Sequence, residues 1–225
     1  MTASTPLPYG TPDTPRVSVR GEARLEVDPE IAHIHIAVTA RNTDRTTTLE
    51  ELTLRNTRAL DLVKSYGDAV EKLETGLITV APQFADKGRH ERVRSYHGSV
   101  HLTATLNDFT VLGELTTRIA DLPLTSITGP WWSLRPDSPA HREARRLAVQ
   151  EAVQRAREYA DALGARLTAL LELADDGAEN IGYPGMARGG YGAAAAPEPE
   201  LDLEPQRQTV HAQVNARFTM TPPRL

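Results

Sequence analysis

The chain of 225 residues contains no cysteine, and this absence removes several kinds of chemistry at once. It excludes disulfide bonds, thiolate zinc sites, iron–sulfur clusters and a cysteine nucleophile. No apolar run reaches the about 18 residues that a membrane-spanning helix needs, so we expect no transmembrane segment. The N-terminus also lacks the basic and apolar regions of a signal peptide, so the sequence as written predicts a soluble, cytoplasmic protein.

The sequence also has no excess of basic residues. The formal net charge is -5, the sequence pI is near 5.8, and no run is rich in lysine and arginine. Phosphates would find no basic surface to bind, so we expect no nucleic-acid partner. The hydrophobic content of 40% is enough for a sizeable core, which predicts a globular protein.

Two segments have a composition that disfavours a packed core. Residues 1–15 contain four prolines among small polar residues, which predicts a disordered N-terminal lead. Residues 176–205 are rich in glycine, alanine, proline and acidic residues, which predicts a long flexible loop. That loop includes "GMARGGYG", which lacks the strand and helix that a phosphate-binding glycine motif requires on either side.

Between these segments, alternating apolar residues indicate strands. Two such runs, residues 17–27 and 30–40, are separated by Asp28-Pro29, and we expect them to pair as a hairpin. A second hairpin is expected from "LITVAPQF" and "ERVRSYHGSVHLTATL". Three further strands are expected in "LTSITGPWWSL", "ARLTALLELAD" and "RQTVHAQVNARFTM".

Helical spacing indicates three helices. The first follows the capping residues Asn42 to Asp44 and extends to Gly67, and the second follows Asn107 and Asp108. The third covers 138–163, with Ser138 as the N-cap and Gly164 suited to the left-handed position after its end. The sequence thus predicts an α+β fold of antiparallel sheets backed by three helices, in the order β-β-α-β-β-α-β-α-β-β.

The third helix has one buried and one solvated half. Alanines recur every four residues on the buried half, and they leave a shallow surface that lets the helix lie close to a sheet; they are Ala144, Ala148, Ala152, Ala156 and Ala160. Glu151 and Arg155 form an (i, i+4) pair that we assign to the solvated half. Nothing on this helix resembles a ligand cluster.

Four histidines are the candidates for a metal site. His33 and His35 share one face of a predicted strand, and His97 and His101 share a face of another. Four imidazoles would converge on a metal ion if those strands were neighbours. The same faces carry serine and threonine, as a solvent-facing sheet does, so these positions are weak candidates and we assign no metal ligand.

The remaining patterns give no catalytic or cofactor-binding residues. No GxSxG motif accompanies the scattered serine, histidine and aspartate residues, and adjacent carboxylates such as Glu50 and Glu51 point in different directions on a helix. Trp131 and Trp132 alternate across a strand, so one belongs to the core and the other to an exposed face. We therefore expect no enzyme activity and no cofactor.

Four motifs in order resemble the SIMPL-domain proteins of bacteria. They are "VSVRGEARLEVDPEIAHIHIAV", "SYHGSVHLTATLND", "EARRLAVQEAVQRAREYADALGARL" and the final strand of the type V-x-A-x-V-x-A-x-F. The resemblance covers residues 16–221, which we take as one SIMPL-like domain. It implies a periplasmic or cell-envelope protein of unconfirmed biochemical activity, with oligomeric assembly and links to oxidative-stress defence in some members. It implies no catalytic residues, and this sequence departs from it in having no signal peptide or lipoprotein cysteine.

The function we expect is a non-catalytic, homo-oligomeric binding or scaffold protein whose protein partner the sequence does not identify. Long strands with open edges, or the alanine face, would provide the contact between copies. The alternative is a metal-binding protein or metal-dependent enzyme that uses the strand histidines. A third reading, a carrier of a small apolar ligand between sheet and helices, has only the alanine face in its favour.

Overall fold

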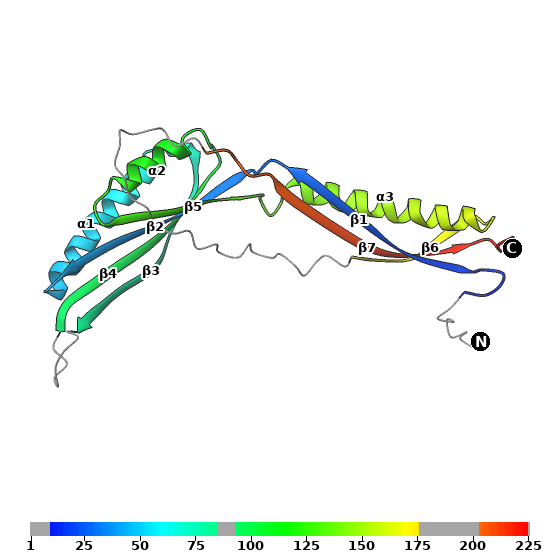
Figure 1. Ribbon diagram of the computed structural model, residues 1–225, viewed down its shortest axis with the longest axis horizontal. Coiled ribbons are helices and arrows are strands. Elements are labelled where there is room, and N and C mark those ends of the chain that lie inside the picture. The colour runs from blue at the N-terminus through cyan, green and yellow to red at the C-terminus, as the bar shows by residue number, and fades with distance from the viewer. Residues whose placement is uncertain (1–9, 85–92, 176–202, 225) are drawn as a thin grey trace, which may run out of the picture. The chain divides into compact units, whose positions relative to one another are not determined.

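The computed structural model describes residues 10–84, 93–175 and 203–224 (Figure 1), and the chain divides into two compact units. It passes from the first unit to the second after Val27 and back to the first after Arg135. The predicted α+β class and the predicted order of strands and helices are both confirmed.

The first unit is built on a three-stranded sheet with the order β1-β7-β6. These strands are β1 (Arg16–Val27), β6 (Leu167–Asp175) and β7 (Gln208–Met220), and β6 and β7 are antiparallel. The central strand is therefore β7, the last strand of the chain. Every second residue of β7 from Val210 to Met220 is buried, which confirms the alternation predicted for this strand.

Helix α3 (Pro139–Ala162) packs along β1 and has the ends that the sequence predicts (Figure 1). The Ser138 hydroxyl accepts a hydrogen bond from the backbone N–H of Ala140 at 3.3 Å. Gly164 has a φ of 63°, the left-handed conformation that follows many helix ends. The residues at its two ends are thus enough to predict where this helix begins and ends.

The alanine stripe of α3 lets the helix lie directly against the backbone of β1 at Gly21. All five stripe alanines are fully buried. A Cβ atom placed on Gly21 of β1 would collide with the carbonyl oxygen of Ala148 and lie 2.7 Å from the Cβ of Ala152. Small residues are therefore required on both sides of this contact.

The second unit is a four-stranded antiparallel sheet with the order β3-β4-β2-β5. Its strands are β2 (Ile31–Asn42), β3 (Val70–Phe84), β4 (Val93–Leu106) and β5 (Thr125–Ser133). The expected hairpin of β3 and β4 is confirmed. Helices α1 (Arg45–Lys64) and α2 (Leu112–Ala120) pack on one face of the sheet, where they enclose a core that includes Ile34, Ile36, Leu102, Leu115 and Ile119.

One predicted pairing is wrong: β1 and β2 do not form a hairpin. β2 pairs with β4 and β5, while β1 belongs to the other sheet, beside β7. The break at Asp28-Pro29 marks the passage between the two units and not a hairpin turn. Alternation shows that a segment is a strand, but not which strand it will pair with.

Two helix ends also differ from the sequence expectation. α1 ends at Lys64 with Ser65 as its C-cap, and Gly67, with a φ of 53°, begins a short 3-10 helix (Gly67–Ala69). α2 begins at Leu112, later than its predicted cap, because the Asp108 carboxylate accepts hydrogen bonds from the N–H and hydroxyl of Thr110 and so stabilises a turn instead.

Parts of the predicted lead and loop lie outside the described residues. For the lead these are residues 1–9, and Thr11 and Thr14 then form a bridge across a tight turn. For the loop they are residues 176–202, which include "GMARGGYG". Leu203 follows and packs against the core of the second unit. No helix among the described residues is long and apolar enough to cross a membrane.

The contact at Gly21 gives a prediction for stability. Gly21→Ala should lower the free energy of unfolding by about 1–3 kcal/mol, because the new methyl group has to push α3 away from β1. The control is Gly76→Ala on β3, where a Cβ would lie 3.5 Å from its nearest neighbour and the change should be about 0.5 kcal/mol or less. Urea unfolding of both variants measures the difference, and equal stabilities would contradict the close contact.

Candidate interaction surfaces

All four histidines singled out by the sequence lie on the face of the four-stranded sheet opposite its helices; we call it the histidine face. In the β2–β4 pairing, His33 stands opposite Thr105, Ala37 opposite His101, and Arg41 opposite His97. Paired residues, and alternate residues along one strand, share a face. The structure thus makes these strands neighbours and puts the four imidazoles on one surface.

The same register spreads the four histidines along the sheet. His97 is level with Arg41, which is eight residues from His33 and therefore more than about 25 Å away at the rise of a strand. Because imidazole nitrogens bind zinc at about 2.0–2.1 Å, His33 and His97 cannot ligate one ion. Among the residues that the structure describes, no group of three or more histidine, cysteine, aspartate or glutamate side chains could hold a metal.

His33 joins β2 to both of its neighbouring strands. Its Nδ1 atom lies 3.0 Å from the Thr105 hydroxyl of β4, and its Nε2 atom lies 2.9 Å from the Ser133 hydroxyl of β5. Partial burial lowers the pKa of His33, and the nearby His35 lowers it further. A neutral imidazole donates from one nitrogen and accepts at the other, and hydroxyls serve in both roles. The geometry gives His33 a structural role in the sheet.

This lowered pKa predicts a pH dependence of stability. The unfolded chain binds the proton more readily than the folded chain, so the contribution of His33 is complete above the unfolded pKa of about 6.5 and is lost as the pH falls through that value. The free energy of unfolding should fall more steeply between about pH 7.5 and 5.5 for the wild type than for His33→Gln. Urea unfolding across this range tests it, with His101→Gln as the control on the same face. Parallel curves for wild type and His33→Gln would contradict it.

The two tryptophans lie on opposite faces of β5, as predicted. Trp132 packs against the core, with its ring centroid 4.8 Å from that of Phe109. Trp131 lies on the histidine face, where its ring meets the His35 ring edge-on at 4.6 Å. Trp131 is itself half-buried, so this face presents only part of the ring to solvent.

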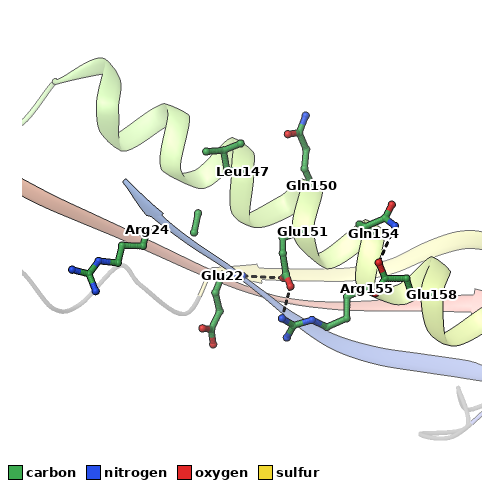
Figure 2. A pocket seen from close by; sticks show the side chains of 9 residues that line it. Glu22, Arg24, Leu147, Gln150, Glu151, Gln154, Arg155 and Glu158 are labelled. Carbon is green, nitrogen blue, oxygen red and sulfur yellow. Dashed lines mark hydrogen bonds and ion pairs between the residues drawn. The ribbon is translucent and has the colours of Figure 1, made fainter. Parts of the chain in front are cut away.

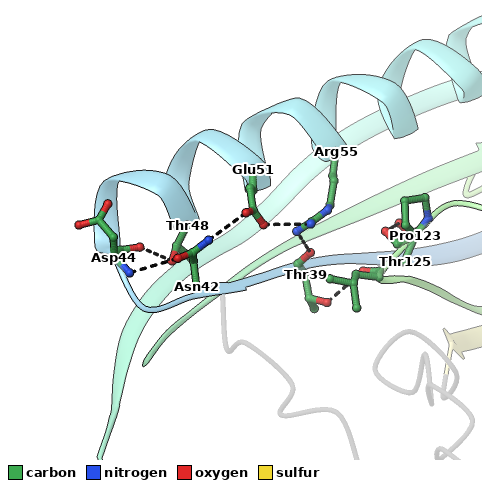
Figure 3. Close-up of polar contacts among 9 residues, drawn as sticks. Thr39, Asn42, Asp44, Thr48, Glu51, Arg55, Pro123 and Thr125 are labelled. Atoms are coloured by element: carbon green, nitrogen blue, oxygen red, sulfur yellow. Dashed lines mark hydrogen bonds and ion pairs between the residues drawn. The ribbon is translucent and has the colours of Figure 1, made fainter. Parts of the chain in front are cut away.

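A chain of polar contacts holds the N-terminal half of α1 against β2 (Figure 3). The Glu51 carboxylate accepts hydrogen bonds from the Asn42 amide at 3.0 Å and from the Arg55 guanidinium at 2.9 Å. Arg55 also donates to the Thr39 carbonyl oxygen at 3.1 Å. Both oxygens of Glu51 are therefore engaged in positioning the helix, and Glu51 is a structural carboxylate.

A second polar contact lies in the first unit, at the edge of β1 (Figure 2). The Glu151 carboxylate of α3 accepts a hydrogen bond from the backbone N–H of Glu22 at 3.1 Å. Arg155 of α3 donates to the backbone carbonyl of Arg20 at 2.8 Å, and Glu151 and Arg155 form an ion pair. Both residues line the shallow groove between β1 and α3. Two helix side chains thus occupy backbone groups that an edge strand would otherwise offer to another strand.

The sequence pattern missed this role of Glu151 and Arg155. Their spacing indicated a salt bridge on the solvated half of the helix, and the ion pair is confirmed. What the spacing does not show is that this flank of α3 lies over the edge of β1. The Gly21 contact sets that position, and the only sequence signal for it is a glycine in β1 opposite an alanine-striped helix.

Removing these two side chains should expose the edge of β1. The double variant Glu151→Ala with Arg155→Ala should lose about 1 kcal/mol of stability and should gain mass with concentration in light scattering. Its control is Glu143→Ala with Arg146→Ala, which removes a salt bridge of the same helix that lies on its exposed side. If both double variants behave alike, Glu151 and Arg155 do not protect the edge.

The opposite edge of the three-stranded sheet is apolar; we call β6, with its three exposed leucines, the β6 edge. Leu170, Leu171 and Leu173 are 54%, 46% and 47% exposed. Leu170 pairs with Phe218 and Leu173 with Ala216, and both of these β7 residues are buried on the face covered by α3. The helix-covered face of the sheet therefore continues onto β6, where Leu170 and Leu173 remain half exposed, whereas Leu171 lies at a shift in the β6–β7 register.

Together these features describe an α+β protein of two antiparallel sheets, in which helix side chains bond two backbone groups of the outer strand β1 and the outer strand β6 carries exposed leucines. The chain belongs to the SIMPL family, whose description is "protein of unknown function (DUF541)" and which matches residues 17–218. The match runs through both compact units.

Two curated relatives are similar along most of their length. They are the 26 kDa periplasmic immunogenic proteins of Brucella melitensis and Brucella abortus, each 26% identical over 215 residues, which is 90% of this chain and 84% of the relative. A solved structure of a Burkholderia cenocepacia protein, proposed to be an amidohydrolase or peptidase, is 15% identical and covers 59% of this chain and 33% of that one, with a TM-score of 0.24. A likeness that weak carries no argument about fold or activity.

Proposed function

We propose that the chain is a non-catalytic subunit of a homo-oligomer that serves as a binding or scaffold protein. The observation that carries the proposal is the β6 edge, where three half-exposed leucines lie on a strand at the margin of a sheet. An edge strand offers backbone N–H and C=O groups, and exposed apolar side chains favour burial. A second protein surface would bond these backbone groups and bury these side chains at the same time.

The polar side chains of the described residues support the non-catalytic part of this proposal. The two nitrogens of His33 and the two carboxylate oxygens of Glu51 make hydrogen bonds that join structural elements. The remaining candidate histidines are distributed along a sheet face and do not converge on one point. Catalysis needs groups that converge on a reacting atom, and these groups hold strands and helices together instead.

We extend the proposal to the location of the protein. The Brucella relatives are named periplasmic proteins, and the similarity to them covers most of both chains. We accordingly place the assembly in the periplasm or cell envelope, with a role in the stress response as the physiological setting that the family resemblance suggests.

A native mass spectrum of the purified protein tests the oligomer directly. We expect a mass that is a multiple of the 24.6 kDa chain, without added mass from a metal ion or small molecule. Light scattering at micromolar concentration should give the same stoichiometry. A monomer in both measurements would overturn the proposal, and a stoichiometric metal would favour the metal-binding alternative.

A further inference from the structure

We propose that the histidine face binds an acidic polysaccharide, and that binding tightens as the pH falls and imidazoles gain charge. The proposal rests on the binding function proposed above and names the class of ligand. The surface belongs to the four-stranded sheet alone, on the side opposite α1 and α2.

The histidine face presents polar side chains to solvent along three neighbouring strands. Two of its four histidines, His35 of β2 and His101 of β4, are exposed, and so are Arg41 of β2 and Lys72 of β3. The other two histidines are half-buried. A ligand that lies along the sheet can therefore reach cationic or titratable groups from β2, β3 and β4.

Positive and titratable groups outnumber carboxylates on this face. Four of the seven histidines of the chain lie here, together with Arg41. Among the described residues that the register places on the face, Glu74 is the single carboxylate, and it forms an ion pair with Lys72 at 2.8 Å. Glu71, at a shift in the β3–β4 register, is bonded to Arg135, and β5 contains no charged residue. The face is thus poor in negative charge, although the chain has 30 acidic residues.

The open face of the three-stranded sheet has a different charge pattern. Its charged residues form pairs of opposite sign, which are Arg20 with Glu22, Arg24 with Glu26, and Arg217 with Glu172. Such pairs compensate one another without a ligand. Among the described residues of the histidine face, Lys72 and Glu74 make the one pair of this kind. The remaining groups favour a partner that supplies the negative charge.

The spacing of these groups favours a long ligand over a compact one. His33 and Arg41 are eight residues apart on β2, which is more than about 25 Å at the rise of a strand. A compact anion would reach only a few of the groups. An extended polymer with a carboxylate in each repeating unit contacts many of them at once, and the separate weak contacts add avidity.

The neutral side chains favour a sugar polymer over an acidic protein segment. All four strands contribute hydroxyl groups to the face, among them Thr39, Thr79, Ser99, Thr103 and Thr128. Hydroxyl groups and neutral imidazoles both donate and accept hydrogen bonds, as the hydroxyls of a sugar require. Trp131 adds part of an aromatic ring. Protein partners depend more on clusters of apolar anchors, and the exposed residues here are mainly polar.

Polygalacturonate, a polymer of a uronic acid, is the probe for the full-length protein. At low salt, titration calorimetry should show binding at least about fivefold tighter at pH 5.5 than at pH 7.5, and added salt should weaken it. Neutral dextran should not bind. If polygalacturonate does not bind at pH 5.5, or binds equally well at both pH values, the proposal is wrong.

Two double variants separate this face from the overall charge of the protein. His97→Gln with His101→Gln should weaken binding at pH 5.5 by at least about threefold, because two charged groups leave the face. His141→Gln with His211→Gln removes the same number of imidazoles from α3 and β7 of the first unit and should leave the affinity unchanged. Far-ultraviolet circular dichroism checks that both remain folded. Equal losses of affinity in the two variants would contradict binding at the histidine face.

Two further outcomes distinguish the polysaccharide from a protein ligand and from the proposed oligomer. Polyglutamate that binds as tightly as polygalacturonate at the same carboxylate concentration would exclude the polysaccharide and favour an acidic protein segment. A monomer that binds polygalacturonate would overturn the homo-oligomer and leave this proposal standing. An oligomer that does not bind it would do the reverse.

Discussion

The backbone of an edge strand needs hydrogen-bond partners, and the three-stranded sheet meets this need differently at its two edges. At β1 the partners come from within the chain, through the carboxylate of Glu151 and the guanidinium of Arg155. Among the described strands, β6 has a neighbour only on the side of β7. The polarity of the two edges follows the same division, since charged side chains occupy one and leucines the other.

The close approach of α3 to β1 explains why the two edges differ. A helix is about 10 Å across with its side chains, and three strands at a spacing of about 4.8 Å present a wider surface than it can cover. The buried alanines and Gly21 fix α3 over the β1 side of the sheet. Glu151 and Arg155 then reach the β1 edge, while the leucines of β6 lie beyond the cover of the helix. One steric contact thus determines which edge the helix side chains reach and which strand carries the exposed leucines.

Sequence patterns correctly predict features that depend on residues close together in the sequence. They fail for contacts between segments that are far apart in the sequence. The caps of α3, its alanine stripe and the alternation of β7 follow from local preferences, and all three are confirmed. The partner of β1 is β7, the last strand of the chain, so the prediction that β1 pairs with the nearest strand, β2, is wrong. The same limit applies to the surfaces. Alternation correctly puts each pair of histidines on one face of its strand, but the common face of the two pairs, the distance between them and the reach of Glu151 to β1 depend on register and packing.

The contrast between the histidine face and the β6 edge bears on what kind of function this fold supports. On the histidine face, hydroxyl groups lie within hydrogen-bond distance of both nitrogens of His33, so this partly buried histidine holds strands together. The contact that we propose at the β6 edge would rely mainly on backbone groups, which every sequence possesses, and on apolar side chains of no particular identity. Such a surface requires apolar residues on an outer strand, but it does not require particular amino acids at particular positions. The proposed function therefore requires that relatives 26% identical to this chain share a pattern of residues, and it does not require a shared set of catalytic residues.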